Sequence, residues 1–270
     1  MSENILICPK CSCGLEEING SLICENRHTY DLSASGYVNF NTKLSVSGDS
    51  PDMVNARSRF LDLGYYEGFA REIVSTLDSF KPEKVIDAGC GEGYYSNMIA
   101  KELDYTSLYG FDLSKSAVNK ASKRARASGT NARFFVCGIF DLPIRENSID
   151  AVVSLFAPLA YDEFHRVLKP GGRLVIGAAG KEHLLGLKRA LYSDVYENNP
   201  EKVVSPEGFR ELSRNNIRYD VSINTSQAIS DLFSMTPYYW KTGEDAAARL
   251  SELDKLDTAL DFDIIVFERL

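Results

Sequence analysis

A short apolar strand, a turn with glycine at every second position and a helix follow one another in Val85-Ile-Asp-Ala-Gly-Cys-Gly-Glu-Gly-Tyr-Tyr-Ser96. The turn residues Gly89, Gly91 and Gly93 have no side chains and tolerate unusual dihedrals, so the backbone there can approach a ligand closely. The helix after the turn points its free N–H groups toward the same place. This order of elements predicts an α/β fold that binds a ligand at the end of the first strand.

A second strand is expected over Ser107–Asp112, about twenty residues after the turn, where the Asp112 carboxylate can accept both hydroxyls of a ribose. The glycine spacing is Gly-x-Gly-x-Gly, not the Gly-x-Gly-x-x-Gly of dinucleotide-binding folds. Because no pyrophosphate then needs to be held, the pattern favours S-adenosylmethionine as the cofactor. The segment therefore predicts the Rossmann-like core of a class I SAM-dependent methyltransferase.

Other candidate cofactor residues follow from the rule that ligands gather at the carboxyl ends of parallel strands. Asp87 is expected to order the glycine turn or to reach the ammonium group of the methionine moiety. Glu92, Tyr95 and Ser96 stand where hydroxyls and N–H groups can meet the methionine carboxylate.

The third strand is expected to end beside the adenine. Cys137 and Gly138 would face the base there. Asp141 is either a partner of the exocyclic amine or a residue that only forms the turn.

A pattern of metal ligands lies far upstream of this core. Cys8-Pro-Lys-Cys11 is followed by Cys24-Glu-Asn-Arg-His28. Two pairs of soft ligands on short turns, separated by a spacer of hairpin length, suit tetrahedral zinc with three thiolates and one imidazole. Cys13 stays open as an alternative to Cys11.

The chain is long enough for one α/β domain and a small module. We expect a zinc-binding module over residues 1–40, a linker and helical segment over 41–80, and a methyltransferase domain over 81–270. Alternating strands and helices predict a parallel sheet with helices on both faces. The last strands are expected over 218–224 and 262–267, the latter antiparallel and closing one edge.

The charge of the chain bears on its partners. The formal net charge is −8, which counts against tight nonspecific nucleic-acid binding as the main activity. Basic residues cluster over 115–126 and 181–189, where solvated helix faces are the simpler interpretation. Cysteines arranged as metal ligands and the lack of a long apolar run predict a cytoplasmic protein with no membrane contact.

The residues also resemble a known family. The motifs that carry the resemblance are the zinc pattern, Gly36-Tyr-Val-Asn39, Arg59-Phe-Leu-Asp-Leu-Gly64 with Tyr66, Asp87-Ala-Gly-Cys-Gly-Glu-Gly-Tyr-Tyr95, Ala157-Pro158, His183-Leu184 and Met235-Thr-Pro237 with Trp240. In this order they are similar to the bacterial 23S rRNA (guanine-N1)-methyltransferases of the RlmA type. The similarity covers nearly the whole chain.

This resemblance implies a zinc module that helps to recognise an RNA hairpin and a domain that methylates N1 of a flipped guanine. It implies Zn2+ on Cys8, Cys11, Cys24 and His28, and it adds Tyr66, Tyr95, Ser96 and His183 to the cofactor site. Members of this family are often homodimers, and the oligomeric state of this chain stays open.

A flipped guanine needs aromatic walls, because they compensate part of the cost of unstacking. Phe156, Tyr238 and Trp240 are the candidate substrate-binding residues, whereas Tyr239 is expected in the core. The residues single out no general base for the proton on guanine N1.

Two other functions compete with this interpretation. A small-molecule methyltransferase acting on a quinone or polyketide-like acceptor would have the same core, although a small acceptor gives no reason for a metal-stabilised module. A binding protein with an inactive core is the third hypothesis, and the intact glycine turn and Asp112 count against it.

Overall fold

The computed structural model describes residues 5–41, 49–192, 194–195, 197–198, 203–240, 242–243, 248–250 and 252–270. Residues 42–48 of the expected linker and helical segment over 41–80 therefore lie outside the described residues. Within the described part, no helix is long and apolar enough to cross a membrane.

The strands of the larger sheet are β4 (Val38–Asn39), β5 (Lys84–Ala88), β6 (Ser107–Asp112), β7 (Arg133–Val136), β8 (Ile149–Leu155), β9 (Leu168–Ala179), β10 (Phe209–Ile223) and β11 (Leu256–Arg269). A smaller sheet consists of β1 (Leu15–Ile18), β2 (Ser21–Cys24) and β3 (Thr29–Asp31). The helices are α1 (Pro51–Asp62), α2 (Glu67–Asp78), α3 (Tyr94–Glu102), α4 (Lys115–Ser128), α5 (Tyr161–Val167), α6 (Leu185–Leu191) and α7 (Ser226–Ser234), with a 3-10 turn η2 (Pro237–Trp240).

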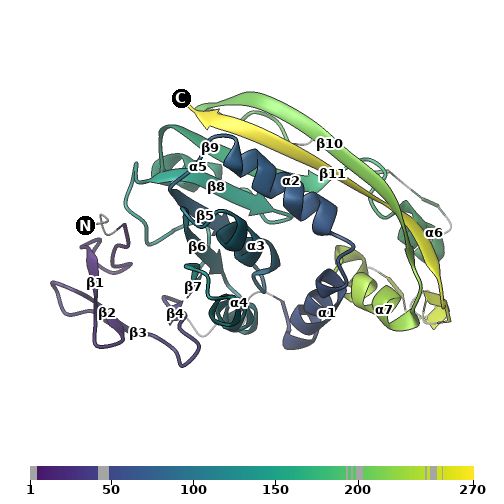
Figure 1. Cartoon of the computed structure of the whole chain (residues 1–270), viewed down its shortest axis with the longest axis horizontal. Coiled ribbons are helices and arrows are strands. Elements are labelled where there is room, and N and C mark those ends of the chain that lie inside the picture. Colours follow the sequence, from purple (N-terminus) through teal and green to yellow (C-terminus); the bar gives the residue numbers. More distant parts are fainter. Residues whose placement is uncertain are drawn as a thin grey trace.

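The order of the larger sheet is β10-β11-β9-β8-β5-β6-β7-β4 (Figure 1). Strands β9, β8, β5, β6 and β7 are parallel to one another, as expected for a Rossmann-like methyltransferase core. The carboxyl ends of these strands form one rim, which carries the glycine turn after β5 and Asp112 at the end of β6.

The last strand does not close an edge of the sheet, so that prediction is wrong. Strand β11 lies between β9 and β10 and is antiparallel to both, and β10 forms the edge. Nearly all of β11 is buried, whereas most of β10 is exposed or half-buried. An apolar strand such as β11 is stable only when neighbours cover it, which explains its interior position. Both strands are also longer than expected.

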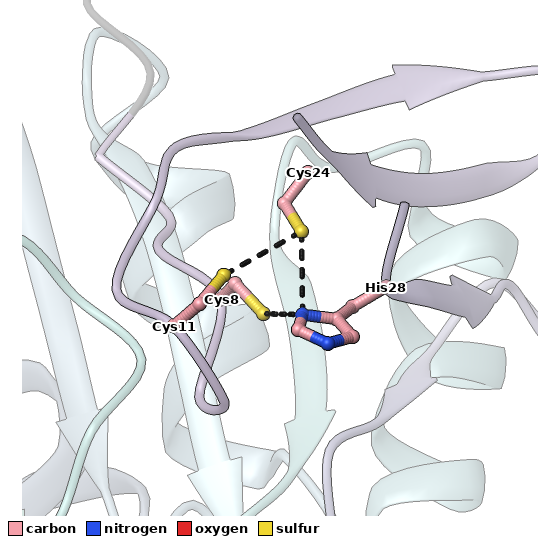
Figure 2. Close-up of side chains that lie close together, drawn as sticks. All are labelled: Cys8, Cys11, Cys24 and His28. Atoms are coloured by element: carbon pink, nitrogen blue, oxygen red, sulfur yellow. Dashed lines mark hydrogen bonds between the residues drawn. The ribbon is translucent and has the colours of Figure 1, made fainter. Parts of the chain in front are cut away.

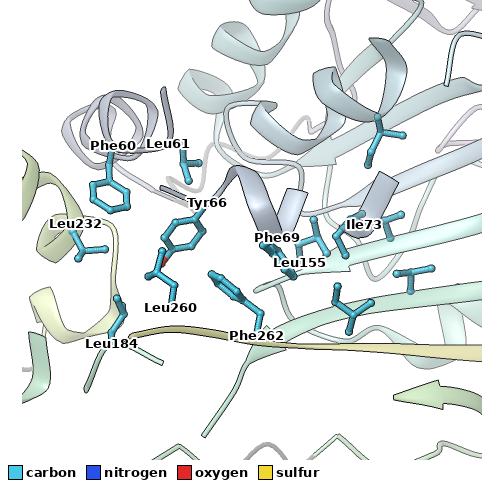
Figure 3. Packing of buried hydrophobic residues seen from close by; sticks show 14 of the residues in the cluster. Phe60, Leu61, Tyr66, Phe69, Ile73, Leu155, Leu184, Leu232, Leu260 and Phe262 are labelled. Atoms are coloured by element: carbon cyan, nitrogen blue, oxygen red, sulfur yellow. The ribbon is translucent and has the colours of Figure 1, made fainter. Parts of the chain in front are cut away.

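Helices α1 and α2 contribute side chains to the hydrophobic core that strands β8 and β11 also line. Ser50 caps α1 by accepting a hydrogen bond from the Met53 N–H at 3.3 Å, and proline stands in its first turn, both ordinary helix-start signals. Phe69, Ile73 and Leu77 repeat at a spacing of four and are fully buried, which is the core-facing stripe of α2. Figure 3 shows this core, where side chains of α1 and α2 meet those of β8 and β11.

The N-terminal module is joined directly to the catalytic sheet. Val38 and Asn39 of β4 pair in parallel with Phe135 and Val136 of β7. The Phe40 ring stacks on Phe135 with centroids 5.6 Å apart. One hydrophobic cluster thus runs from the module into the sheet, and the two parts form a continuous structure.

Candidate active site and metal centre

The glycine turn between β5 and α3 has the conformation that its sequence requires. Gly89, Gly91 and Gly93 have φ angles of 86°, 54° and 79°, in the left-handed region that favours glycine. A Cβ on Gly89 would stand 2.6 Å from the Cβ of Ala157, and one on Gly93 would stand 2.6 Å from the Cβ of Ala121. The turn is therefore a backbone cradle with no room for side chains at these two positions.

Asp112 faces this turn from the end of β6. Its Oδ2 accepts a hydrogen bond from the Gly91 N–H at 3.0 Å, and its Oδ1 accepts one from the Ser114 N–H at 2.7 Å. Burial raises the pKa of Asp112, although these N–H groups partly oppose the rise. Each carboxylate oxygen has a second lone pair. Asp112 is thus oriented by backbone and still able to accept the two hydroxyls of a ribose.

Asp87 connects the first strand to the helix after the turn. It is fully buried, and its Oδ2 accepts a hydrogen bond from the Ser96 hydroxyl at 2.5 Å. Burial raises the pKa of Asp87 to about 7, and the nearby Asp112 and Glu92 carboxylates act in the same direction. Ser96 therefore holds Asp87 in place, which supports the role in ordering the turn.

Glu92 adds a third carboxylate to the turn. Its side chain is buried, and its Oε1 has no hydrogen-bond partner among the described residues. Burial raises the pKa of Glu92. Three carboxylates close to one narrow turn favour a cationic ligand, because like charges in a poorly hydrated site need compensation. S-adenosylmethionine, with its sulfonium and ammonium groups, fits this donor set.

Arg57 of α1 also reaches the turn, although it was not among the residues predicted from the sequence. Its Nη1 would lie 3.7 Å from a Cβ on Gly91, and the guanidinium forms an ion pair with Asp49. Burial alone would lower the pKa of Arg57, but Asp49 and Glu92 raise it. The signal was present, because Arg57 stands among the apolar positions of α1 that repeat at helical spacing.

A buried histidine and a buried tyrosine form a hydrogen-bonded pair beside Phe156. The Nδ1 of His183 accepts a hydrogen bond from the Asp261 N–H at 3.2 Å, and its Nε2 lies 3.2 Å from the Tyr66 hydroxyl oxygen. Burial lowers the pKa of His183 to about 4, so the ring is neutral at pH 7. Since Nδ1 is an acceptor, Nε2 carries the hydrogen and donates it to Tyr66.

Phe156, directly after β8, is held in a strained conformation beside His183. Its φ is 55°, which is unfavourable for a bulky residue and is a feature that often marks functional sites. The ring lies 6.2 Å from that of His183 at an interplanar angle of 25°, and 5.4 Å from that of Phe69. It remains 47% exposed, so one part of the ring is accessible to a ligand. Tyr95 packs against Phe69 at 5.7 Å and completes this group.

The other predicted substrate residues lie in η2. Tyr238 is half-buried, with its ring 6.2 Å from that of Tyr192. Trp240 is 71% exposed and has a ring contact with Tyr239, but none with Phe156 among the described residues. The structure thus does not bring Trp240 and Phe156 together. Tyr239 is 44% exposed, so its expected place in the core is wrong.

The end of β7 lies beside Asp112, where the adenine was expected. The Cys137 N–H donates to the Asp112 carbonyl oxygen at 3.0 Å. Burial raises the pKa of the Cys137 thiol to about 12, so the side chain is a neutral filler. Gly138 is half-buried and lies next to Leu113, an exposed apolar residue that was not among those predicted from the sequence.

Cys8, Cys11, Cys24 and His28 converge in the N-terminal module (Figure 2), with all four ligand atoms within 4.8 Å of one another. Cys11 Sγ lies 3.7 Å from Cys24 Sγ, and the His28 Nδ1 lies 3.4 and 3.5 Å from the sulfurs of Cys8 and Cys24. With Zn–S bonds of about 2.3 Å, Zn–N bonds of about 2.0–2.1 Å and tetrahedral angles, the expected separations are about 3.8 Å between sulfurs and about 3.5 Å between sulfur and nitrogen. The cluster therefore has the dimensions of a zinc tetrahedron.

Two neighbours surround this cluster without belonging to it. Cys13 lies outside the four-residue group, and its sulfur accepts a hydrogen bond from the Asn26 amide at 3.4 Å. The Tyr30 hydroxyl lies 3.3 Å from the sulfur of Cys8. Such hydrogen bonds to ligands orient them in metal sites. The geometry thus favours Cys11 over Cys13 as the ligand.

Comparisons with known proteins agree with this geometry. Residues 85–172 match the family described as a methyltransferase domain, and residues 6–41 match the N-terminal zinc ribbon of RlmA. The Bacillus subtilis protein YxjB, to which a 23S rRNA (guanine-N1)-methyltransferase activity is ascribed, is 31% identical over 96% of this chain and 95% of its own. The chain belongs to the 23S rRNA (guanine-N1)-methyltransferase family. Its cofactors are S-adenosylmethionine and Zn2+.

A second relative and a solved structure support the family and the fold. The 23S rRNA (guanine(748)-N(1))-methyltransferase of Streptomyces fradiae is 30% identical over 90% of this chain and 89% of its own. The crystal structure of YcgJ from Bacillus subtilis superimposes with a TM-score of 0.50 at 16% identity, covering 74% of this chain and 97% of that one. The structural similarity concerns the fold alone.

Proposed function

We propose that this protein transfers the methyl group of S-adenosylmethionine to N1 of a guanine in a hairpin of 23S rRNA, in the bacterial cytoplasm. The observation that carries the proposal is the similarity to guanine-N1 methyltransferases across both the zinc module and the catalytic domain. A small-molecule acceptor is not favoured, because it gives no reason for a metal-stabilised module fused to the catalytic sheet.

The cofactor would lie along the rim of the sheet. The residues proposed to hold it are Tyr66, Asp87, Gly89, Gly91, Glu92, Gly93, Tyr95, Ser96, Asp112, Cys137, Gly138 and His183. When bound, S-adenosylmethionine supplies an electrophilic methyl group on a sulfonium. The contribution of the chain is largely positioning, since the leaving group is good and the displacement is in line. The Asp112 oxygens fit the ribose, and the carboxylates around the turn fit the positive charges.

The target guanine must leave its stack before N1 can be reached, and this costs a few kcal/mol. Phe156 is proposed to receive the flipped base, because its ring is partly exposed next to His183 and is fixed by packing on Phe69. Tyr238 and Trp240 remain predicted substrate contacts.

Guanine N1 carries a proton at neutral pH, and methylation requires its removal. His183 is not suited to accept it, because its Nε2 already bears a hydrogen and its pKa is lowered to about 4. Since Tyr66 accepts the hydrogen of His183, the hydroxyl hydrogen of Tyr66 is directed to another acceptor. We therefore propose that the pair orients a ligand by donating a hydrogen bond and does not act as the base.

Cys8, Cys11, Cys24 and His28 are proposed to hold Zn2+ in a closed site, in which four protein ligands leave no position for a substrate. The metal would then stabilise the module that recognises the RNA. The oligomeric state stays open, and sedimentation would measure it.

The test is methyl transfer from labelled S-adenosylmethionine to ribosomal RNA from a strain that lacks this protein. N1 methylation blocks the pairing edge of guanine, so reverse transcription should stop strongly at one guanine of 23S rRNA. No incorporation by a protein that binds the cofactor would contradict the proposal and favour a small acceptor.

A further inference from the structure

Helix α4 carries a charge that differs from that of the rest of the chain. It has five basic residues and no acidic one, whereas the whole chain has a net charge of −8. The five are Lys115, Lys120, Lys123, Arg124 and Arg126. Of these five, Arg124 alone forms an ion pair among the described residues, and its partner is Asp62. The charges of the other four are not neutralised there.

This pattern costs stability. Lys120 stands four residues before Arg124 and three before Lys123, and Lys123 stands three before Arg126. Like charges at these spacings destabilise a helix by roughly 0.2–0.5 kcal/mol per pair. Lys115 adds a positive charge at the helix N-terminus, where the macrodipole disfavours cations. An anion bound along the helix would relieve this repulsion.

Three of these basic residues and Asn119 lie in one line on α4. Lys115, Asn119, Lys123 and Arg126 are spaced by four, four and three positions, so they share one face of the helix, which we call the α4 face. At 1.5 Å per residue this face is about 16 Å long. It begins directly after the strand that ends in Asp112, and therefore at the cofactor rim.

The far half of the α4 face borders a cavity of about 490 Å³ against the N-terminal module. Its polar lining consists of Ser33, Ser35, Tyr37, Asn119, Lys123 and Arg126. Two cations with hydroxyl and amide donors form a suitable environment for phosphate oxygens. The cavity thus presents donors from the module and from the catalytic domain together.

Hydrogen bonds join the two sides of this cavity, which are the N-terminal module and α4. The Ser35 hydroxyl donates to Asn119 Oδ1 at 2.8 Å, and the Ser122 hydroxyl donates to the Ser35 carbonyl oxygen at 2.6 Å. Arg126 donates to the Ala34 carbonyl oxygen at 2.6 Å. In Figure 1, α4 lies between β4 of the module and α1 of the catalytic domain. The α4 face therefore links the metal-binding module to the rim as one fixed surface.

We propose that the α4 face and its cavity bind the sugar–phosphate backbone of the RNA stem next to the target guanine. This inference rests on the proposed function and names the surface that the RNA would occupy. A polyanion of several phosphates matches the length of the face and its three cations, which have no acidic partner among the ion pairs of the described residues. Phosphate contacts set register and orientation but carry no sequence information, so this surface positions the hairpin and leaves base selection to other residues.

The test compares Lys115→Ala/Lys123→Ala with a control, Lys84→Ala/Lys101→Ala, that removes the same charge from the start of β5 and the end of α3. None of the four lysines has an ion pair among the described residues, so the substitutions remove charge and no ion pair. Binding to unmodified 23S rRNA is measured at several KCl concentrations. Methyl transfer and cofactor affinity are measured in parallel.

The α4 variant should bind RNA at least about tenfold more weakly at low salt, and its slope of log K against log salt should fall by about two units, one for each lost phosphate contact. Its KM for RNA should rise, while kcat and cofactor affinity stay unchanged, and the control should match wild type. Unchanged affinity and slope in the α4 variant, or an equal loss in the control, would overturn this inference alone. A wild-type protein that binds the cofactor yet leaves the RNA unmethylated would instead overturn the proposed function.

Discussion

Replacing Asp87 with asparagine should make the free protein more stable at high pH. The pKa of the buried Asp87 carboxyl is about 7 in the folded chain, against an ordinary value of 3.8. Between these two values the folded state keeps a proton that the unfolded chain has lost, so the free energy of unfolding falls as pH rises. At about 1.4 kcal/mol per unit, ionised Asp87 destabilises the fold by roughly 4 kcal/mol above pH 7, of which about 3 kcal/mol develops between pH 5 and 8.

Asp87→Asn removes this dependence while keeping an oxygen that can accept the hydrogen bond of the Ser96 hydroxyl. Urea unfolding of the zinc-loaded protein, followed by circular dichroism at pH 5, 6, 7 and 8, gives the free energy of unfolding for both proteins. The variant should gain about 3 kcal/mol relative to wild type between pH 5 and 8. Asp104→Asn, at an exposed position after α3, is the control and should follow wild type.

Parallel pH profiles for wild type and Asp87→Asn would refute the reasoning, since they would mean that the Asp87 carboxylate is not destabilised by its burial. The same variant should bind S-adenosylmethionine more weakly at pH 8, because it lacks a negative charge near the cationic ligand. A gain in stability together with a loss of binding would show that the site keeps a destabilising charge for function.

Three further substitutions test the cofactor site, the metal site and the hydrogen bond between Tyr66 and His183. Asp112→Ala should weaken cofactor binding by about tenfold or more, because two hydrogen bonds to a charged acceptor are lost; calorimetry with an unchanged affinity would exclude the ribose contact. Cys24→Ala should abolish zinc binding and unfold the N-terminal module, since metal binding and folding are coupled in so small a unit; metal analysis and RNA methylation measure this, and full methylation without zinc would contradict it. Tyr66→Phe should cost about 1–3 kcal/mol of stability by leaving the His183 Nε2–H without its acceptor; thermal unfolding equal to wild type would show that another group accepts that hydrogen.

Local patterns in the sequence predicted the centre of the fold well. The strand over Ser107–Asp112 has the expected bounds, and a helix follows the glycine turn as expected. These elements combine a strong hydrophobic period with turn residues that admit few conformations. The zinc ligands were also predictable, because two close pairs on short turns fix the geometry locally.

Features that depend on distant contacts were not predictable. The two residues of β4 carry no periodic signal, so their pairing with β7 could not be foreseen. The order of β10 and β11 depends on which of the two strands has neighbours on both sides, and the sequence alone does not predict this. The positive φ of Phe156 arises from the packing around it, and no turn residue marked it in advance.

Strand β4 has one more consequence, for solubility. Without it, β7 would be the outer strand of the larger sheet, with unpaired N–H and C=O groups beside the apolar Phe134 and Phe135. Uncovered edges of this kind invite pairing with other chains and aggregation. A shortened protein that starts after residue 41 would therefore lose more than its metal site. It would expose β7 as an unpaired edge strand that can pair with other chains. We therefore expect it to precipitate even though every proposed cofactor residue is retained.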